Sequence, residues 1–98
     1  MIVKVLSNTM APGYATEFVN VTIDGRNNRM KIVAENGNAY SHLKVYTVNI
    51  ETGLHLLASD DDIPGYKYVD YYLSDNKRID KNEANIEAAK NWIKQVFA

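Results

Sequence analysis

The sequence predicts an α+β fold: an antiparallel β-meander of five or six strands with one C-terminal amphipathic helix packed on one face. Short segments in which apolar and polar residues alternate, as in half-buried strands, recur between residues 16 and 73. The connections between them are too short for crossover helices, so neighbouring strands are expected to run antiparallel. Beyond residue 80 the apolar spacing changes to the 3.6-residue period of a helix.

Length and composition limit the class of protein. The 98 residues are expected to form a single small globular domain, 1–98, because a chain of this length buries one modest core. A hydrophobic content of 46% and a charged content of 23% are typical of a folded chain. The absence of cysteine excludes disulfides and thiolate metal sites and fits a cytoplasmic location. No membrane span or signal peptide is predicted.

The first half of the chain contains three predicted strands. Residues 2–6 are apolar and β-branched and predict a buried strand, whereas residues 7–15 contain Asn, Pro and Gly and predict a loop. Residues 16–23 alternate and predict a strand, with Val19, Val21 and Ile23 on one side and Phe18, Asn20 and Thr22 on the other. Asp24-Gly25 predicts a turn that extends through Asn28. Residues 29–34 alternate again, with Met30, Ile32 and Ala34 inward.

Further strands are predicted over residues 40–50, 54–58 and 66–73. Asn36-Gly37 is the strongest hairpin signal and precedes the first of them. In the first, Leu43, Val45 and Thr47 share one face and Tyr46, Val48 and Ile50 the other.

The last element is a helix. Asp80, followed three residues later by Glu83, fits a capping box, so the helix is predicted to begin there. Its apolar stripe contains Ile86, Ala89, Trp92, Ile93, Val96 and Phe97. Burying these side chains against the sheet is expected to contribute strongly to the stability of so small a domain.

The candidate functional stretch runs from Ser59 to Tyr72. Three consecutive aspartates precede a Pro-Gly turn, and four of the seven tyrosines follow within seven residues. Residues 51–75 carry six acidic and one basic side chain, although the whole chain has a net charge of −1. Tyrosines beside Asp, Ser and Gly are typical of protein-binding surfaces. The predicted contact set is Asp60, Asp61, Asp62, Tyr66, Tyr68, Asp70 and Tyr72.

No catalytic or metal motif is found. Asp60, Asp61 and Asp62 lack the spacing of a calcium loop, and consecutive aspartates seldom chelate one ion together. His42 and His55 are not flanked by a nucleophile motif, and the five glycines are scattered rather than grouped in a phosphate-binding loop. The sequence therefore predicts a protein that is not an enzyme and has no cofactor or metal.

Two alternatives remain open. Arg26, Arg29 and Lys31 form a basic hairpin end that, with aromatic help, would bind nucleic acid. Direct binding is disfavoured because the clustered tyrosines adjoin carboxylates, which repel phosphate. The other alternative is a structural or assembly subunit that forms a homo-oligomer through an exposed strand edge.

In size and composition the chain resembles accessory proteins of viruses and mobile elements, including anti-CRISPR and anti-restriction inhibitors. That resemblance covers no specific residues. It implies an inhibitor of host or bacterial defence enzymes. Independently of that resemblance, four clustered aspartates, Asp60, Asp61, Asp62 and Asp70, suit a protein partner with a basic surface, such as a nucleic-acid-handling enzyme, and predict a non-catalytic protein-binding module. The clustered aspartates would occupy a phosphate-binding groove of that partner and block it, and electrostatic steering would speed the encounter.

Overall fold

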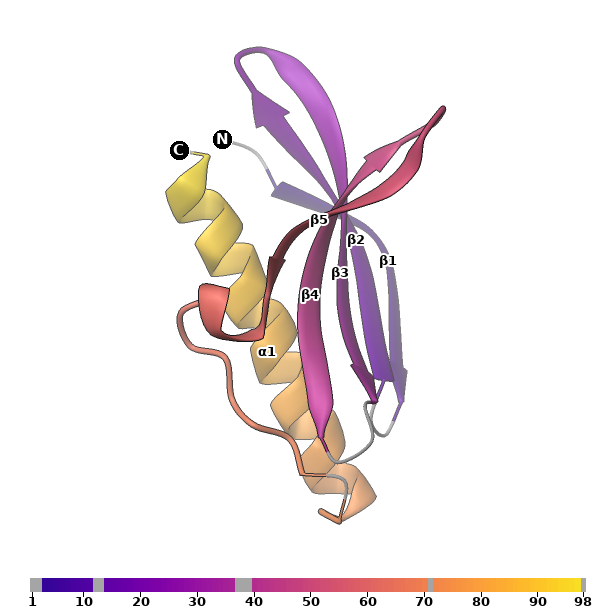
Figure 1. Ribbon diagram of the computed structural model, residues 1–98, viewed down its shortest axis with the longest axis vertical. Helices are drawn as coiled ribbons and strands as arrows, with labels where there is room; N and C mark the ends of the chain where they lie inside the picture. The colour runs from indigo at the N-terminus through magenta and orange to yellow at the C-terminus, as the bar shows by residue number, and fades with distance from the viewer. Residues whose placement is uncertain (1–2, 12–13, 37–39, 71, 98) are drawn as a thin grey trace.

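A computed structural model describes residues 3–11, 14–36, 40–70 and 72–97. One antiparallel sheet has the strand order β1-β2-β3-β4-β5, followed by a short 3₁₀-helix, η1, and a long helix, α1 (Figure 1). The elements are β1 (Val3–Ala11), β2 (Tyr14–Ile23), β3 (Arg26–Asn36), β4 (Ser41–Asn49), β5 (Gly53–Ser59), η1 (Asp60–Asp62) and α1 (Asp75–Val96). The α+β class, with an antiparallel meander and one C-terminal helix, is confirmed.

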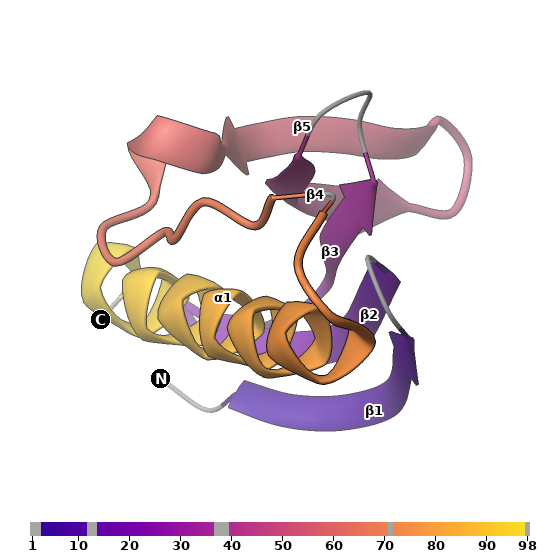
Figure 2. The same ribbon diagram turned by 90° about the horizontal axis from the view of Figure 1, so that it is seen from below.

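The sheet curves around the helix, which lies on its concave side (Figure 2). Alternation along β2, β3 and β4 places one row of apolar side chains against α1, as predicted, and these side chains are buried: Val19, Val21, Met30, Ile32, Ala34, Leu43 and Val45. The helix contributes Ile86, Ala89 and Ile93 to the same core, with Trp92 and Phe97 packed at its margin. Val96, predicted to join them, is 52% exposed, so that prediction is wrong.

An ion pair also joins helix and sheet. Nζ of Lys90 lies 2.6 Å from Oε2 of Glu17, and their side chains are only 15% and 6% exposed. Glu17 lies on the helix-facing side of β2, opposite the buried Ile32 of β3.

Several predicted boundaries are wrong. Most of the loop predicted over residues 7–15 is strand, because β1 extends to Ala11 and β2 begins at Tyr14. The turn after β2 contains only Asp24 and Gly25, both with positive φ (51° and 77°), and β3 begins at Arg26. Ile50 is an exposed turn residue rather than part of a strand face. The hairpin predicted at Asn36-Gly37 involves residues 37–39, which lie outside the described residues.

Helix α1 begins five residues before the predicted Asp80. Its N-cap is Ser74, whose hydroxyl accepts a hydrogen bond from the backbone N–H of Lys77 (3.4 Å). An ion pair between Arg78 and Asp75 (2.7 Å) supports the first turn. Within the described part of the chain, no helix has both the length and the apolar character needed to cross a membrane.

Candidate protein-interaction site

The acidic and tyrosine-rich stretch connects β5 to α1 along one side of the molecule. The strand predicted over residues 66–73 does not form in its described residues, 66–70 and 72–73, where one β-bridge joins Asp70 to Tyr40. Ile63 and Val69 point inward and are buried. The rest of this segment is held mainly by hydrogen bonds to the helix and to β4.

Asn85 holds the segment against the helix. The backbone N–H of Lys67 donates to Oδ1 of Asn85 (2.7 Å), and Nδ2 of Asn85 donates to the carbonyl oxygen of Lys67 (2.9 Å). The buried amide of Asn85 therefore bonds both backbone polar groups of Lys67, as a neighbouring strand would do in a sheet. Gly65 has a φ of +89°, a backbone conformation that favours glycine, where the chain passes close to Ala88 of the helix.

The other side of the segment is tied to the start of β4. The N–H of Ser41 donates to the carbonyl oxygen of Val69 (2.9 Å), and the hydroxyl of Tyr66 donates to the carbonyl oxygen of Ser41 (2.8 Å). Burial, followed by the charge of Asp60, raises the pKa of Tyr66 to about 12. The hydroxyl of Tyr66 is therefore engaged inside the protein.

Asp60 is also engaged internally. Its Oδ1 accepts a hydrogen bond from the backbone N–H of Leu43 (2.7 Å), and its Oδ2 lies 2.9 Å from Nδ1 of His42. These contacts attach η1 to β4. Asp62 also has a local role, because its carboxylate accepts a hydrogen bond from the N–H of Ser59 (3.2 Å).

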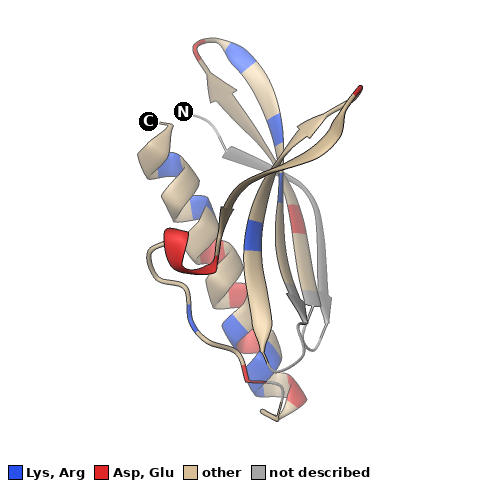
Figure 3. Ribbon diagram, in the orientation of Figure 1, with Lys and Arg blue, Asp and Glu red and all other residues tan. Residues whose placement is uncertain are grey.

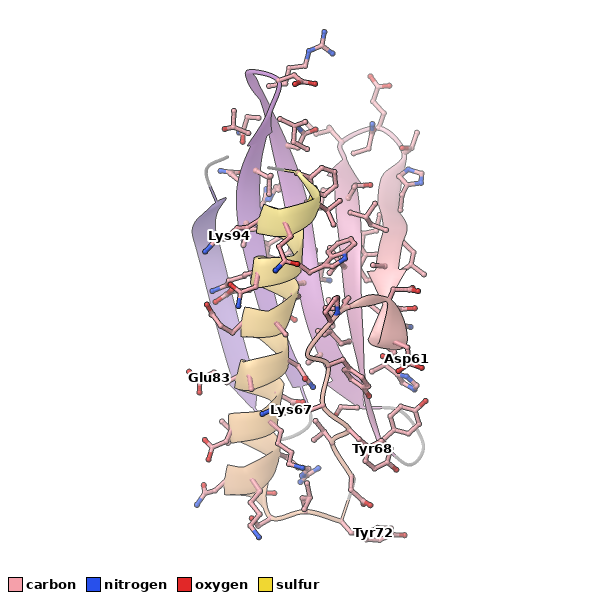
Figure 4. The ribbon with its side chains drawn as sticks, turned by 90° about the vertical axis from the view of Figure 1, so that its left-hand side faces the viewer. Asp61, Lys67, Tyr68, Tyr72, Glu83 and Lys94 are labelled. Carbon is pink, nitrogen blue, oxygen red and sulfur yellow. The ribbon has the colours of Figure 1, made fainter. Side chains whose placement is uncertain are left out.

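The remaining predicted contact residues are more exposed. Asp61, Tyr68 and Tyr72 lie along the same side of the molecule, whereas Lys67 points across the helix (Figure 4). Tyr68 is 52% exposed and Tyr72 is 91% exposed. Asp70 is half-buried and accepts a hydrogen bond from the N–H of Tyr72 (2.8 Å).

An aromatic row supports Tyr68. Its ring centroid lies 4.9 Å from that of Tyr40, which in turn lies 4.4 Å from that of His42. His42 contacts Asp60, so the row continues to the carboxylate that anchors η1. The sequence prediction missed Tyr40, His42 and Asn85, because they lie outside the stretch and only the fold brings them to it.

The predicted basic residues lie elsewhere. Arg26 is exposed at the β2–β3 hairpin, while Arg29 and Lys31 lie on the sheet face that points away from α1. The Arg29 guanidinium is 4.8 Å, and Lys31 Nζ 5.7 Å, from the ring centroid of Phe18. Figure 3 shows the acidic η1 beside the helix, apart from this basic group.

The described residues include no group of three or more His, Cys, Asp or Glu side chains placed to hold a metal ion. His55, which precedes the aspartates in sequence, lies instead in the β4–β5 hairpin, where its Nε2 is 2.6 Å from the hydroxyl of Thr52. The site is a surface of carboxylates and tyrosines held by the hydrogen bonds described above.

Compared with models of protein families, with curated proteins and with solved structures, the chain matches none. Fold and site together define a small α+β domain that presents an ordered acidic and aromatic surface.

Proposed function

We propose that the protein is a non-catalytic binding module that covers a basic, nucleic-acid-binding surface of a partner protein, as a small inhibitor or accessory protein does. The observation that carries this proposal is that the exposed side chain of Tyr68 is held in position by its neighbours. Its ring is half exposed, yet it stacks on Tyr40 and its neighbour Lys67 is clamped by Asn85. A large aromatic side chain that is already ordered loses little entropy on binding.

Three carboxylates belong to the same segment as this aromatic anchor. Asp61 and Asp62 are exposed, and Asp70 lies two residues beyond Tyr68. Such an arrangement favours a partner with a basic surface, because complementary charge accelerates encounter and the aromatic anchor slows dissociation. On a nucleic-acid-handling enzyme the carboxylates would stand where phosphates bind. Asp60 and Tyr66 contribute by holding the surface in place.

The test is a pull-down from lysate of the native host. The bait is wild type, Tyr68→Ala, or Asp61→Asn/Asp62→Asn, which leaves Asp60 and its contacts intact. The matched control, Asp24→Asn/Glu51→Gln, removes the same charge from two exposed turns. Circular dichroism and thermal unfolding first establish that all four chains fold.

We expect wild type and the control to capture one basic protein. Tyr68→Ala should weaken its binding by about 30-fold, the size of a hot-spot loss. Asp61→Asn/Asp62→Asn should lower the association rate by about tenfold, with a weaker salt dependence. Equal capture by all four folded chains, or capture by none, would contradict the proposal.

A second candidate function is binding of single-stranded nucleic acid on the sheet face that points away from α1. Arg29, Lys31 and Lys44 alternate onto that face with Phe18 and Tyr46. Aromatic rings among cations suit stacked bases and phosphates. Fluorescence anisotropy with a labelled oligothymidine tests it: affinity should fall as salt rises and fall again in Arg29→Ala.

A further inference from the structure

Strand β5 forms one end of the sheet, and no described strand pairs with its outer side. Such an edge presents unpaired N–H and C=O groups to which another strand can add. Within Gly53–Ser59 only Ala58 is buried, and the strand contains neither a charged residue nor a proline. A bulge at Leu57, where the register with β4 shifts, is the one feature that interrupts the edge.

Exposed apolar side chains gather on the same hairpin. Among the described residues seven large hydrophobic side chains are exposed, and four of them belong to residues 50–57: Ile50 (102%), Leu54 (46%), Leu56 (57%) and Leu57 (39%). Isolated exposed leucines are ordinary, but four exposed apolar side chains on one hairpin indicate an interaction surface.

The β4–β5 hairpin also projects away from the helix and from the β2–β3 hairpin (Figures 1 and 2). We call its outer part, residues 48–57, the β4–β5 arm. A two-stranded ribbon is only marginally stable in water by itself. Covering the leucines and pairing the free edge would therefore stabilise the arm considerably.

We propose that the arm binds a second copy of this chain, with the two β5 strands paired antiparallel about a two-fold axis. A strand without charges has nothing to repel its own copy. It also offers no charge by which a different partner would be selected. Two-fold pairing brings the same leucines together from both chains, so each copy contributes the same surface to the interface. Tyr68 and the aspartates of the candidate site lie outside the arm, so this pairing does not cover them.

The test measures mass in solution by sedimentation across concentrations from about 1 µM to about 200 µM, since mass action governs the dimer. Wild type should shift from monomer to dimer. Leu56 is the middle residue of β5 and lies near the proposed axis, so Leu56→Lys and Leu56→Glu should each remain monomeric through like-charge repulsion. The control Val96→Lys changes an exposed apolar residue on α1 and should dimerise like wild type.

Mixing Leu56→Lys with Leu56→Glu provides a second measurement. Opposite charges across the axis should restore the dimer, an effect that neither variant shows alone. A wild type that stays monomeric at every concentration would overturn the proposal, as would dimers that persist in both Leu56 variants. A mixture that remains monomeric although wild type dimerises would overturn the two-fold pairing of β5. A monomeric wild type whose capture of the lysate partner depends on Leu56 would assign the edge to a foreign strand.

Discussion

The hydroxyl of Tyr66 illustrates how single residues hold the candidate site in place. It donates to the carbonyl oxygen of Ser41, 25 residues earlier in the chain, and burial, followed by the charge of Asp60, raises its pKa. The sequence showed a tyrosine beside aspartates, and that pattern predicted a partner contact. It did not show that β4 would supply an internal acceptor, because this depends on how the sheet folds back.

The raised pKa of Tyr66 predicts a loss of stability at high pH. The pKa is about 12 in the folded protein and 10.0 for the free side chain, so between these values the unfolded chain has released the proton that the folded chain keeps. The unfolded state then binds fewer protons, and the free energy of unfolding falls as pH rises. The contribution is fully present below pH 10 and is lost through about pH 12.

Urea unfolding of wild type and Tyr66→Phe across this range tests the prediction. Below pH 10 the variant should be less stable by about 1 kcal/mol, because the hydrogen bond to Ser41 is lost. Between pH 10 and 12 its stability should fall less steeply than that of wild type. Parallel pH profiles for the two proteins would show that Tyr66 is not the titrating group.

At the scale of the element, two buried asparagines on α1 differ sharply in their surroundings. Asn85 makes two hydrogen bonds to the backbone of Lys67. Asn82, three residues earlier, is 0% exposed, and neither atom of its amide has a hydrogen-bond partner among the described residues. A buried amide without partners costs stability, whereas a fully bonded one fixes the segment that it holds.

The same substitution should therefore have opposite effects at the two positions. Asn82→Leu is expected to raise the free energy of unfolding by about 1 kcal/mol, because it removes an unsatisfied polar group at similar volume. Asn85→Leu is expected to lower it by about 2 kcal/mol, because two backbone groups of Lys67 lose their partner. Chemical denaturation measures both. A destabilised Asn82→Leu chain would mean that this amide has a partner in solution.

Element prediction succeeded where one periodicity dominates and failed where tertiary contacts decide. The alternation in β2, β3 and β4 predicted which side chains are buried, because one face of each strand packs on the helix. Residues 66–73 alternate as well, yet the described residues among them form no strand, since Asn85 and the start of β4 supply the hydrogen bonds of Lys67 and Val69. The helix start was misplaced because Ser74 and Asp80 both precede plausible first turns.

At the scale of the whole molecule, the sheet and the helix are joined by the core and by the buried ion pair between Glu17 and Lys90. Lys90 is not part of the apolar stripe that the sequence predicted for the helix, so the sequence did not indicate that its side chain would be buried. Nor did the sequence show that β2 would place a carboxylate opposite. The sequence therefore predicted the layers of the fold, but not this polar contact between them.

This ion pair yields a prediction about the cooperativity of the fold. Lys90→Met removes the lysine ammonium from the buried ion pair with Glu17 and should lower the free energy of unfolding by about 3 kcal/mol. The double variant Glu17→Leu/Lys90→Met should recover most of that loss, because two apolar side chains then meet between sheet and helix. Nζ of Lys90 also lies 3.7 Å from Oε2 of Glu87. Because Glu87 is exposed, Glu87→Gln should lower the free energy of unfolding by less than about 1 kcal/mol.

Urea denaturation followed by circular dichroism and by Trp92 fluorescence measures all four chains. Trp92 is on the helix beside the core, so coincident transitions would show that helix and sheet unfold together. A Lys90→Met chain as stable as wild type would mean that water or another group compensates the charge of Glu17 once the lysine is gone. Full recovery in the double variant would show that the cost arises from the carboxylate that remains, and that apolar packing is enough to join the helix to the sheet.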